Sequence, residues 1–177
     1  MKIFNTPILL ASKSPRRSQL LKEAGFNIRV DSVEVEEIFP ADTPKGSVAA
    51  YLAELKADAS KKLLKKEELL IAADTIVLKN NKIFGKPTDR EDAITTLQQL
   101  SDSSHEVITG VCMILGDQKV VFSETSTVFL NTLSTEEIEY YVDHFNPYDK
   151  AGSYAIQEWI GHCKITKIEG TYNNIMG

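Results

Sequence analysis

The apolar run at residues 69–78 narrows the possible folds of this chain more than any other segment. It is interrupted only by Asp74 and Thr75 and is flanked by charged residues. Its length and its β-branched residues favour a buried strand. Asn80 and Asn81 follow closely and allow a tight hairpin into a short strand at residues 82–84.

Before this run, short apolar segments alternate with helical patterns. Residues 8–11 and 26–33 are typical of strands, and Pro15 suits the first position of a helix between them. Apolar residues spaced by three and four predict an amphipathic helix over 48–63, with Ser47 as its cap. The first part of the chain therefore alternates between strand and helix.

Two capping boxes predict further helices after the run. Thr88 with Glu91 predicts a helix that ends near Leu100, and a box that opens at Ser134 predicts a helix to about Asp143. Both helices lie in the second half of the chain, where they separate segments with strand patterns.

The remaining strands look antiparallel. Residues 107–115 and 120–130 are joined by a short glycine-containing turn, and a last strand is expected near 163–168. Strands linked through helices early and by turns later predict an α/β domain with a mixed sheet. A length of 177 residues suits a single domain over 1–177.

Composition excludes several classes of function. A net charge of −5 counts against a broad nucleic-acid surface, so no nucleic-acid partner is expected. Cys112 and Cys163 form no CxxC pair, which argues against a disulfide or zinc site and fits a reducing cytoplasm. The apolar run at 8–11 is too brief for a membrane span. The expected protein is soluble and cytoplasmic.

The segment from Ser12 to Arg17 combines a strand end, a turn rich in hydroxyls and a helix start. Backbone N–H groups and the positive end of the helix dipole would meet there, which suits an anion. Arg16 and Arg17 oppose that dipole unless an anion such as phosphate relieves the repulsion. Acidic partners elsewhere in the protein would relieve it equally, so the residues alone leave both readings open.

Asp74 is the sharpest candidate for a functional residue. A carboxylate inside an apolar strand is costly to bury unless it is paired, hydrogen-bonded or bound to a metal, and such groups are enriched in active sites. Glu34, Glu36 and Glu37 follow a predicted strand, and one of them could join Asp74 in holding Mg²⁺. A solvated acidic loop is the alternative, and it is stronger for Glu34 and Glu36.

Seven motifs occur along the chain in a specific order. They are Leu10–Arg17, Leu52–Ala57, Ala73–Thr75, Gly85–Pro87, His105–Val111, Asp149–Gln157 and Tyr172–Gly177. With these motifs the chain resembles the Maf family of nucleotide pyrophosphatases from about Ile8 to Gly177.

The resemblance implies an elongated mixed sheet flanked by helices, in two lobes around a deep cleft, as in ITPase-like enzymes. It implies hydrolysis between the α and β phosphates of a nucleoside triphosphate with a divalent metal, Mg or Mn, often in a homodimer. Relatives continue beyond the position of Gly177 into a C-terminal helix, which is expected to be missing here.

The resemblance also assigns roles to single residues. Asp74 is implied to be the catalytic acid, acting as a base or holding the metal together with Glu37. The residues implied to bind substrate are Ser12, Arg16, Arg17, Lys56, Thr75, Lys86 and Gln157. Their cations would meet the roughly four negative charges of a triphosphate. Lys56 beside Asp74 is expected to keep that carboxylate ionised.

Three positions indicate the substrate. Arg16 stands where 7-methyl-GTP pyrophosphatases have tryptophan, and Thr75 and Gln157 match members that prefer dTTP and UTP. The amide of Gln157 can pair with the imide edge of uracil or thymine. Ala155 replaces a frequent glycine, and Glu158 adds a charge beside this expected base site.

The expected function is therefore a dTTP/UTP pyrophosphatase that clears modified pyrimidine nucleotides. Two alternatives remain open: a nucleotide-binding regulator of septum formation and cell division, and a pyrophosphatase for methylated purine nucleotides.

Overall fold

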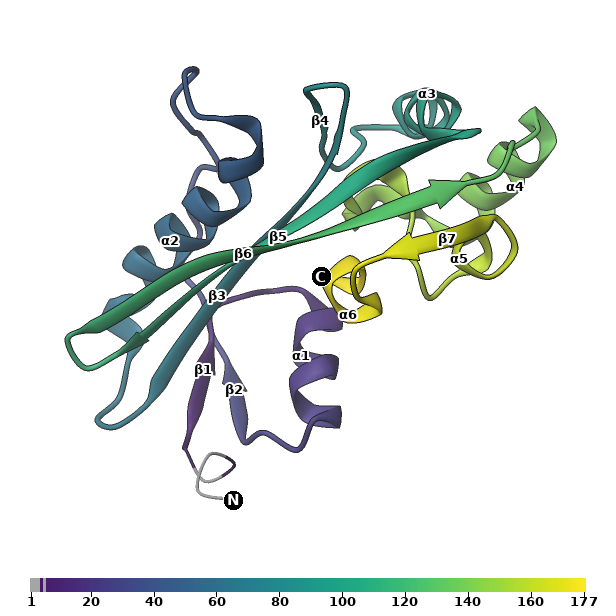
Figure 1. Ribbon diagram of the computed structural model, residues 1–177. Coiled ribbons are helices and arrows are strands. Elements are labelled where there is room, and N and C mark those ends of the chain that lie inside the picture. Colours follow the sequence, from purple (N-terminus) through teal and green to yellow (C-terminus); the bar gives the residue numbers. More distant parts are fainter. Residues whose placement is uncertain (1–3, 5) are drawn as a thin grey trace. The chain divides into compact units, whose positions relative to one another are not determined.

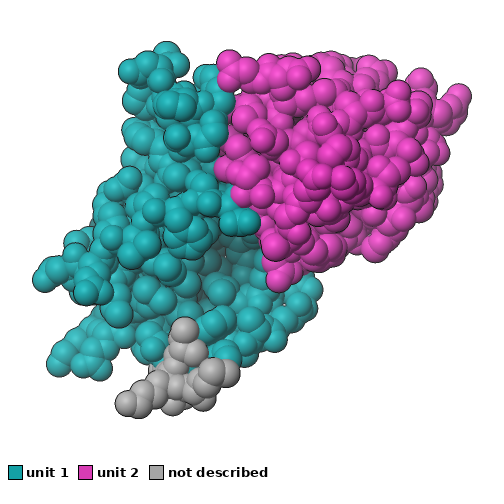
Figure 2. Space-filling view, viewed as in Figure 1, with its two compact units in different colours: residues 1–74, 109–124, 177 teal, residues 75–108, 125–176 magenta. Residues whose placement is uncertain are grey.

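The computed structural model describes Phe4 and residues 6–177, which fall into two compact units. The first unit comprises residues up to Asp74, residues 109–124 and Gly177; the second comprises 75–108 and 125–176 (Figure 2). The chain thus passes from one unit to the other within its long strands. That residues 1–177 act as one domain stays a prediction.

The strands form a seven-stranded mixed sheet in the order β2-β1-β3-β5-β6-β7, with β4 paired to β3 (Figure 1). They are β1 (Ile8–Leu10), β2 (Ile28–Val30), β3 (Leu69–Lys79), β4 (Lys82–Phe84), β5 (Ser103–Leu115), β6 (Gln118–Leu130) and β7 (Ile165–Glu169). β1 runs parallel to β2 and β3, whereas β4 is antiparallel to β3 and β7 to β6. The predicted mixed α/β architecture is confirmed.

Helices and short 3-10 turns connect these strands. The helices are α1 (Pro15–Glu23), α2 (Val48–Ser60), α3 (Arg90–Leu100), α4 (Thr135–Phe145), α5 (Trp159–Cys163) and α6 (Tyr172–Met176). The 3-10 turns are η2 (Lys45–Ser47), η3 (Lys61–Leu63), η4 (Pro147–Asp149) and η5 (Ala151–Ser153). Among the described residues, no helix is long and apolar enough to cross a membrane.

The core of the first unit lies between α2 and the strands beside it. Ala53 and Ala57 of α2 pack against buried apolar residues of β1, β3 and β5. Gly110 of β5 permits this approach, because a Cβ there would lie 2.2 Å from backbone atoms of Ala49 and Ala50. The small residues therefore set how closely α2 packs on β5.

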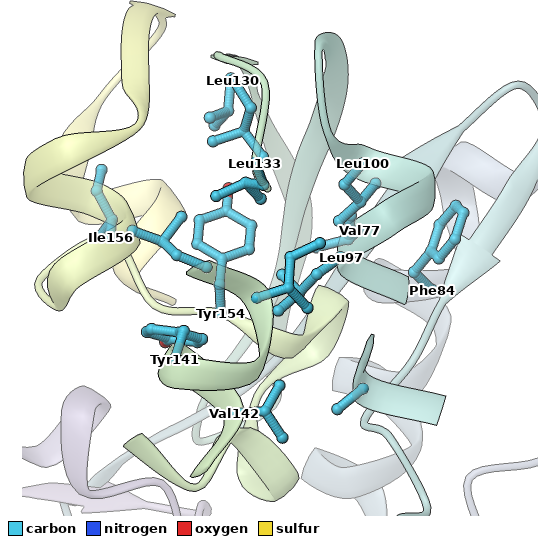
Figure 3. Close-up of a cluster of buried hydrophobic side chains, with 14 of the residues drawn as sticks. Val77, Phe84, Leu97, Leu100, Leu130, Leu133, Tyr141, Val142, Tyr154 and Ile156 are labelled. Carbon is cyan, nitrogen blue, oxygen red and sulfur yellow. The ribbon is translucent and has the colours of Figure 1, made fainter. Parts of the chain in front are cut away.

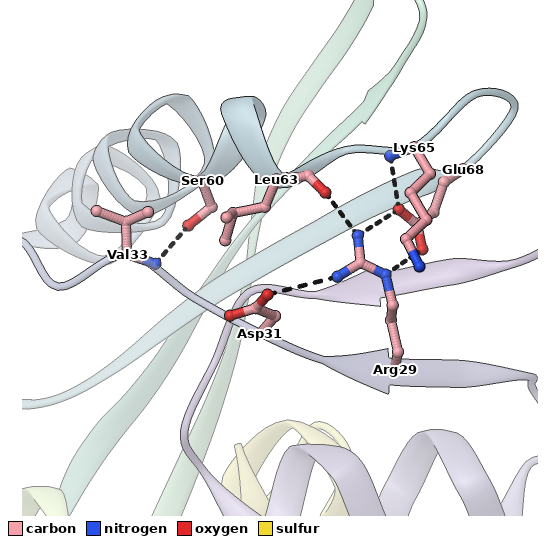
Figure 4. Close-up of polar contacts among 7 residues, drawn as sticks. All are labelled: Arg29, Asp31, Val33, Ser60, Leu63, Lys65 and Glu68. Atoms are coloured by element: carbon pink, nitrogen blue, oxygen red, sulfur yellow. Dashed lines mark hydrogen bonds and ion pairs between the residues drawn. The ribbon is translucent and has the colours of Figure 1, made fainter.

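A partly buried ion pair fixes the start of β3 to β2. Arg29 donates from Nε and Nη2 to the two carboxylate oxygens of Glu68, each at 2.7 Å, and from Nη2 to the carbonyl of Leu63 at 2.6 Å (Figure 4). The bidentate geometry is the strong form of this pair. The contacts of Arg29 thereby fix the path of the chain from η3 into β3, the strand that carries Asp74.

The second unit has its own core of apolar and aromatic side chains (Figure 3). Tyr141 of α4 and Leu97 of α3 are fully buried in it, together with Val77 of β3 and Ile156. Tyr154 joins the same cluster from the loop before α5. This loop carries the Asp149–Gln157 motif, so the core holds that motif in place.

Several local predictions are confirmed by the structure. Asn80 and Asn81 turn the chain between β3 and β4 with φ of 49° and 61°, values typical of a tight hairpin. Ser134 and Glu137 form the predicted capping box at the start of α4.

Other local predictions are wrong. Ser47 does stand at the N-cap position of α2, but its dihedral angles are helical and its side chain makes no capping hydrogen bond. Asp89 rather than Thr88 caps α3, since its carboxylate accepts a hydrogen bond from the Asp92 amide at 2.9 Å. The strand predicted at 26–33 is only three residues long.

Candidate active site

The turn between β1 and α1 is bound to β3 through Arg17. Its Nη1 donates to Ser12 Oγ at 3.2 Å and to the carbonyl oxygen of Ala73 at 2.7 Å. Ser12 Oγ also accepts a hydrogen bond from the amide of Ser14 at 3.2 Å. Arg17 is thereby held beside the residue that precedes Asp74.

Lys56, near the middle of α2, joins two carboxylates from distant segments. Its Nζ forms an ion pair with Asp74 of β3 and lies 2.7 Å from Glu37 Oε1. Asp74 is buried and Lys56 is partly buried, whereas Glu37 is exposed. Three segments of the first unit therefore converge on one ammonium group.

Burial raises the pKa of Asp74 above its ordinary value. Lys56 and Arg17 act in the opposite direction, and Glu37 adds to the rise. Lys56 does favour the charged form, as predicted, but the effect of burial on the pKa is larger. A carboxylate with a raised pKa is a stronger base once it is ionised.

Arg17, at the start of α1, is subject to opposing electrostatic effects. Burial lowers the pKa of Arg17, Arg16 lowers it further, and Asp74 opposes both effects. Asp74 and Glu37 are thus acidic partners of Arg17 within the protein, which is one of the two readings that the sequence left open. Whether a phosphate also binds at this segment stays a prediction.

The acidic loop after β2 divides as the sequence suggested. Glu34 forms an exposed ion pair with Lys13, which lowers the pKa of Glu34, and Glu36 is exposed. Glu37 alone of the three forms an ion pair with Lys56. Thr75 follows Asp74 on β3, so strand alternation directs its side chain to the other face of the sheet.

Lys86 and Gln157 belong to the second unit, where their two loops are joined. The amide of Gly152 donates to the carbonyl of Gly85 at 3.0 Å. Gly152 has φ of 71°, and a Cβ there would lie 2.8 Å from Val77. Lys86 is exposed, while the side-chain oxygen of Gln157 is buried and has no hydrogen-bond partner among the described residues.

Sequence reasoning missed a polar network beside Gln157. Lys150 is buried and its Nζ lies 3.3 Å from a carboxylate oxygen of Glu158. The hydroxyl of Tyr141 donates to the same carboxylate. The charge that Glu158 adds beside the expected base site is therefore paired with the ammonium group of Lys150. A buried tyrosine needs a partner for its hydroxyl, and that requirement was the available signal.

Comparison with known proteins agrees with these motifs. Residues 7–177 match the family model described as Maf-like protein. A relative from Flavobacterium psychrophilum, named dTTP/UTP pyrophosphatase, is 45% identical over 176 residues, which cover 99% of this chain and 90% of the relative. A relative of the same name from Parabacteroides distasonis is 46% identical over 172 residues, covering 96% and 89%.

A solved structure shares the fold. The Staphylococcus aureus Ham1 protein is similar with a TM-score of 0.51 and 19% sequence identity, over 70% of this chain and 71% of that one. At this identity the likeness concerns the fold alone, a mixed sheet flanked by helices. The family match over 171 of 177 residues, by contrast, includes every motif of the sequence from β1 to α6. The chain belongs to the Maf family.

Proposed function

We propose that this chain hydrolyses the nucleoside triphosphates dTTP and UTP to the monophosphate and pyrophosphate. The observation that carries the proposal is the Lys56 ammonium that contacts Asp74 and Glu37, with Arg17 held at Ala73. The name dTTP/UTP pyrophosphatase, given to relatives at 41–46% identity, supports the same substrates.

In the proposed reaction Asp74 acts as the general base. Water attacks the α-phosphorus, one proton of that water passes to the Asp74 carboxylate, and the bond from the α-phosphorus to the bridging oxygen breaks. Its electron pair leaves with pyrophosphate. The pKa of Asp74 is raised by burial, which suits a base, and Lys56 helps to keep the carboxylate ionised before attack.

The cations of the first unit would bind the triphosphate. Arg17 and Lys56 are fixed by contacts to β3, so their charge is in place before substrate arrives. Arg16 and Ser12 would add a cation and a hydroxyl at the start of α1. We also propose that Lys86 binds substrate, because its motif Gly85–Pro87 matches the family.

A divalent cation, Mg or Mn, fits the carboxylates present. Asp74 and Glu37 already converge on a single cationic group, and Mg²⁺ is usually held by one or two carboxylates plus phosphate and water. Within the described part of the chain, no three His, Cys, Asp or Glu side chains form a metal cluster. Once bound with substrate, the ion would neutralise charge on the phosphates.

Base selection is assigned to Gln157, with Arg16 and Thr75 as supporting positions. The buried side-chain oxygen of Gln157 is an acceptor without a partner among the described residues. It suits the N3–H donor of uracil or thymine, which unmodified cytosine lacks at neutral pH.

The test is pyrophosphate release from a panel of nucleotides, with and without Mg²⁺. The panel contains dTTP, UTP, dCTP, dGTP and 7-methyl-GTP. Turnover of dTTP and UTP that requires the metal is expected. Preference for 7-methyl-GTP would identify a purine enzyme instead, and tight nucleotide binding without turnover would identify a regulator.

We also propose that two copies pair through β6. β7 pairs with β6 only from Thr127 to Leu130, so the earlier part of β6 extends beyond its neighbour. Val120 and Phe122 there are 52% and 46% exposed. Antiparallel pairing centred on Val121 would place each Val120 opposite Phe122 of the other copy, which is a self-complementary contact. Sedimentation should show a dimer for the wild type and a monomer for Phe122→Glu.

A cytoplasmic location is proposed as well. Cys112 and Cys163 are both free thiols, which supports a reducing compartment. Fractionation with a thiol-alkylation assay tests this, since recovery of the protein outside the cytoplasm would contradict it.

A further inference from the structure

We infer that Tyr141, Glu158 and Lys150 form a positioning network that sets the base preference of Gln157. The inference rests on the proposed function and goes beyond it, because none of the three residues is assigned a role there. All three lie with Gln157 in the second unit. The inference rests on two neighbouring features: the partly buried Glu158 carboxylate paired with Lys150, and the amide oxygen of Gln157 that has no hydrogen-bond partner among the described residues.

The network holds the backbone on both sides of Gln157. Before it, the amide of Ala155 donates to the Tyr141 hydroxyl at 3.1 Å. After it, the Glu158 carboxylate accepts from that same hydroxyl and pairs with Lys150 at 3.3 Å. One phenol oxygen therefore ties residues 155 and 158 together across the intervening Gln157.

Packing reinforces these hydrogen bonds. Tyr141 is fully buried and Ile156 nearly so, and both lie in the core cluster of the second unit (Figure 3). Gly161 of α5 lies so close that a Cβ there would be 1.7 Å from the Ile156 carbonyl oxygen. The Glu158 amide also donates to the Ala155 carbonyl at 3.2 Å. Residues 155–158 thus have little freedom to move.

Lys150, which is buried, explains how the partly buried Glu158 carboxylate can lie next to a site for an uncharged base. Its Nζ contacts Asp149 at 3.1 Å as well as Glu158, and it donates to the carbonyls of Phe145 and Asn146 at 3.3 and 3.4 Å. Buried charges persist when paired and hydrogen-bonded in this way. Glu158 can then orient the segment without repelling the polar edge of the base.

A fixed segment matters because an amide can pair with either pyrimidine edge. Rotated by half a turn, Gln157 would offer its NH₂ to the N3 acceptor of cytosine and its oxygen to the amino group. In the structure its oxygen is buried and has no partner among the described residues, the arrangement that suits the N3–H of uracil or thymine. Loosening the segment should therefore weaken dTTP binding and erode discrimination against dCTP.

The experiment is a double-mutant cycle on Tyr141→Phe and Gln157→Ala, with kcat and KM measured for dTTP and dCTP in Mg²⁺. Tyr141→Phe keeps the ring and removes the hydroxyl. We expect the KM for dTTP to rise about tenfold, which corresponds to the loss of roughly one hydrogen bond. We expect kcat to change less than twofold and the KM for dCTP to stay constant, because uniform binding is lost rather than chemistry.

The energetic coupling between the two substitutions shows whether Tyr141 acts through Gln157. In the Gln157→Ala background, Tyr141→Phe should change the KM for dTTP less than twofold. A full tenfold effect in that background, or none in the wild type, would overturn the inference. If Tyr141→Phe fails to fold, Glu158→Gln replaces it, since it weakens the Lys150 ion pair while keeping an acceptor for Tyr141.

Tyr154→Phe is the matched control. Its hydroxyl contacts His105 at 2.7 Å in the same core, but it does not contact Glu158 in any described interaction. It should leave the KM for dTTP within twofold of wild type, and an equal tenfold rise would show general loosening and refute the positioning role. Absence of pyrophosphate release from dTTP and UTP by the wild-type protein would instead refute the proposed function.

Discussion

Lys56 of α2 forms an ion pair with Asp74 in the middle of β3. The two residues lie 18 positions apart, and the same ammonium also contacts Glu37. A lysine inside a helix thus compensates a carboxylate that an apolar strand could not otherwise bury.

Lys56→Met should move the acidic limb of the pH–activity profile to higher pH. Asp74 must be ionised to accept a proton, and Lys56 is the largest influence that lowers its pKa against burial. Without Lys56 the pKa of Asp74 rises further, so activity is lost at a higher pH than in wild type. The profile of kcat/KM against pH measures this shift. Lys119→Met is the control. It removes the exposed ion pairs of Lys119 with Glu54 and Asp58, which lie on α2 as Lys56 does, and it should leave the acidic limb of the profile unchanged.

Arg17→Lys should reduce kcat/KM by roughly 10- to 100-fold. One lysine amine cannot reproduce the fixed guanidinium fork that contacts Ser12 and Ala73 while presenting charge to a phosphate. Steady-state kinetics with dTTP measures the loss. Arg90→Lys changes an exposed pair with Asp143 in the second unit and should leave kcat/KM within twofold.

Acid should destabilise the protein through His105. Burial lowers the pKa of His105 to about 4, against about 6.5 in the unfolded chain. At pH values between these two pKa values, the His105 imidazole is mostly protonated in the unfolded chain and mostly neutral in the folded protein. The free energy of unfolding therefore falls as the pH falls. The free energy of unfolding should be about 3 kcal/mol lower at pH 4 than at neutral pH because of this group. Urea unfolding of wild type and His105→Gln across this range measures it, and the variant should lose less. His144→Gln, an exposed site, should follow the wild type.

Gly110→Ala should destabilise the first unit by about 2–3 kcal/mol or more. The added Cβ would lie 2.2 Å from the backbone of α2, which cannot yield as a flexible side chain does. Thermal unfolding measures the change. Gly46→Ala is the control: a Cβ there meets no described atom within 4 Å, so its Tm should stay the same or rise. Equal Tm values for Gly110→Ala and wild type would contradict the packing described for α2.

Much of the fold and part of the site could be predicted because the signals are local. Asp74 stands out within an apolar strand, and Ser134 with Glu137 specifies its capping box by spacing alone. That Glu37 contacts Lys56 while Glu34 pairs with Lys13 depends on the path of the loop, which residue type alone does not specify.

Other features could not be predicted from spacing in the sequence. Asp89, not Thr88, caps α3, because the backbone of Asp89 is extended and its carboxylate accepts a hydrogen bond from the amide of Asp92. α5 and α6 are five residues each, too short for a periodic pattern to indicate them. The contact of Tyr141 and Lys150 with Glu158 requires α4 and the following loop to fold against each other.

Pyrophosphate release by Asp74→Asn tests the catalytic role of Asp74 most directly. The substitution keeps the size of the side chain and removes the proton acceptor, so kcat for dTTP and UTP should fall by roughly 10²- to 10⁴-fold. Circular dichroism should confirm that the variant is folded. A folded Asp74→Asn protein that releases pyrophosphate at the wild-type rate would contradict the role of Asp74 as the base.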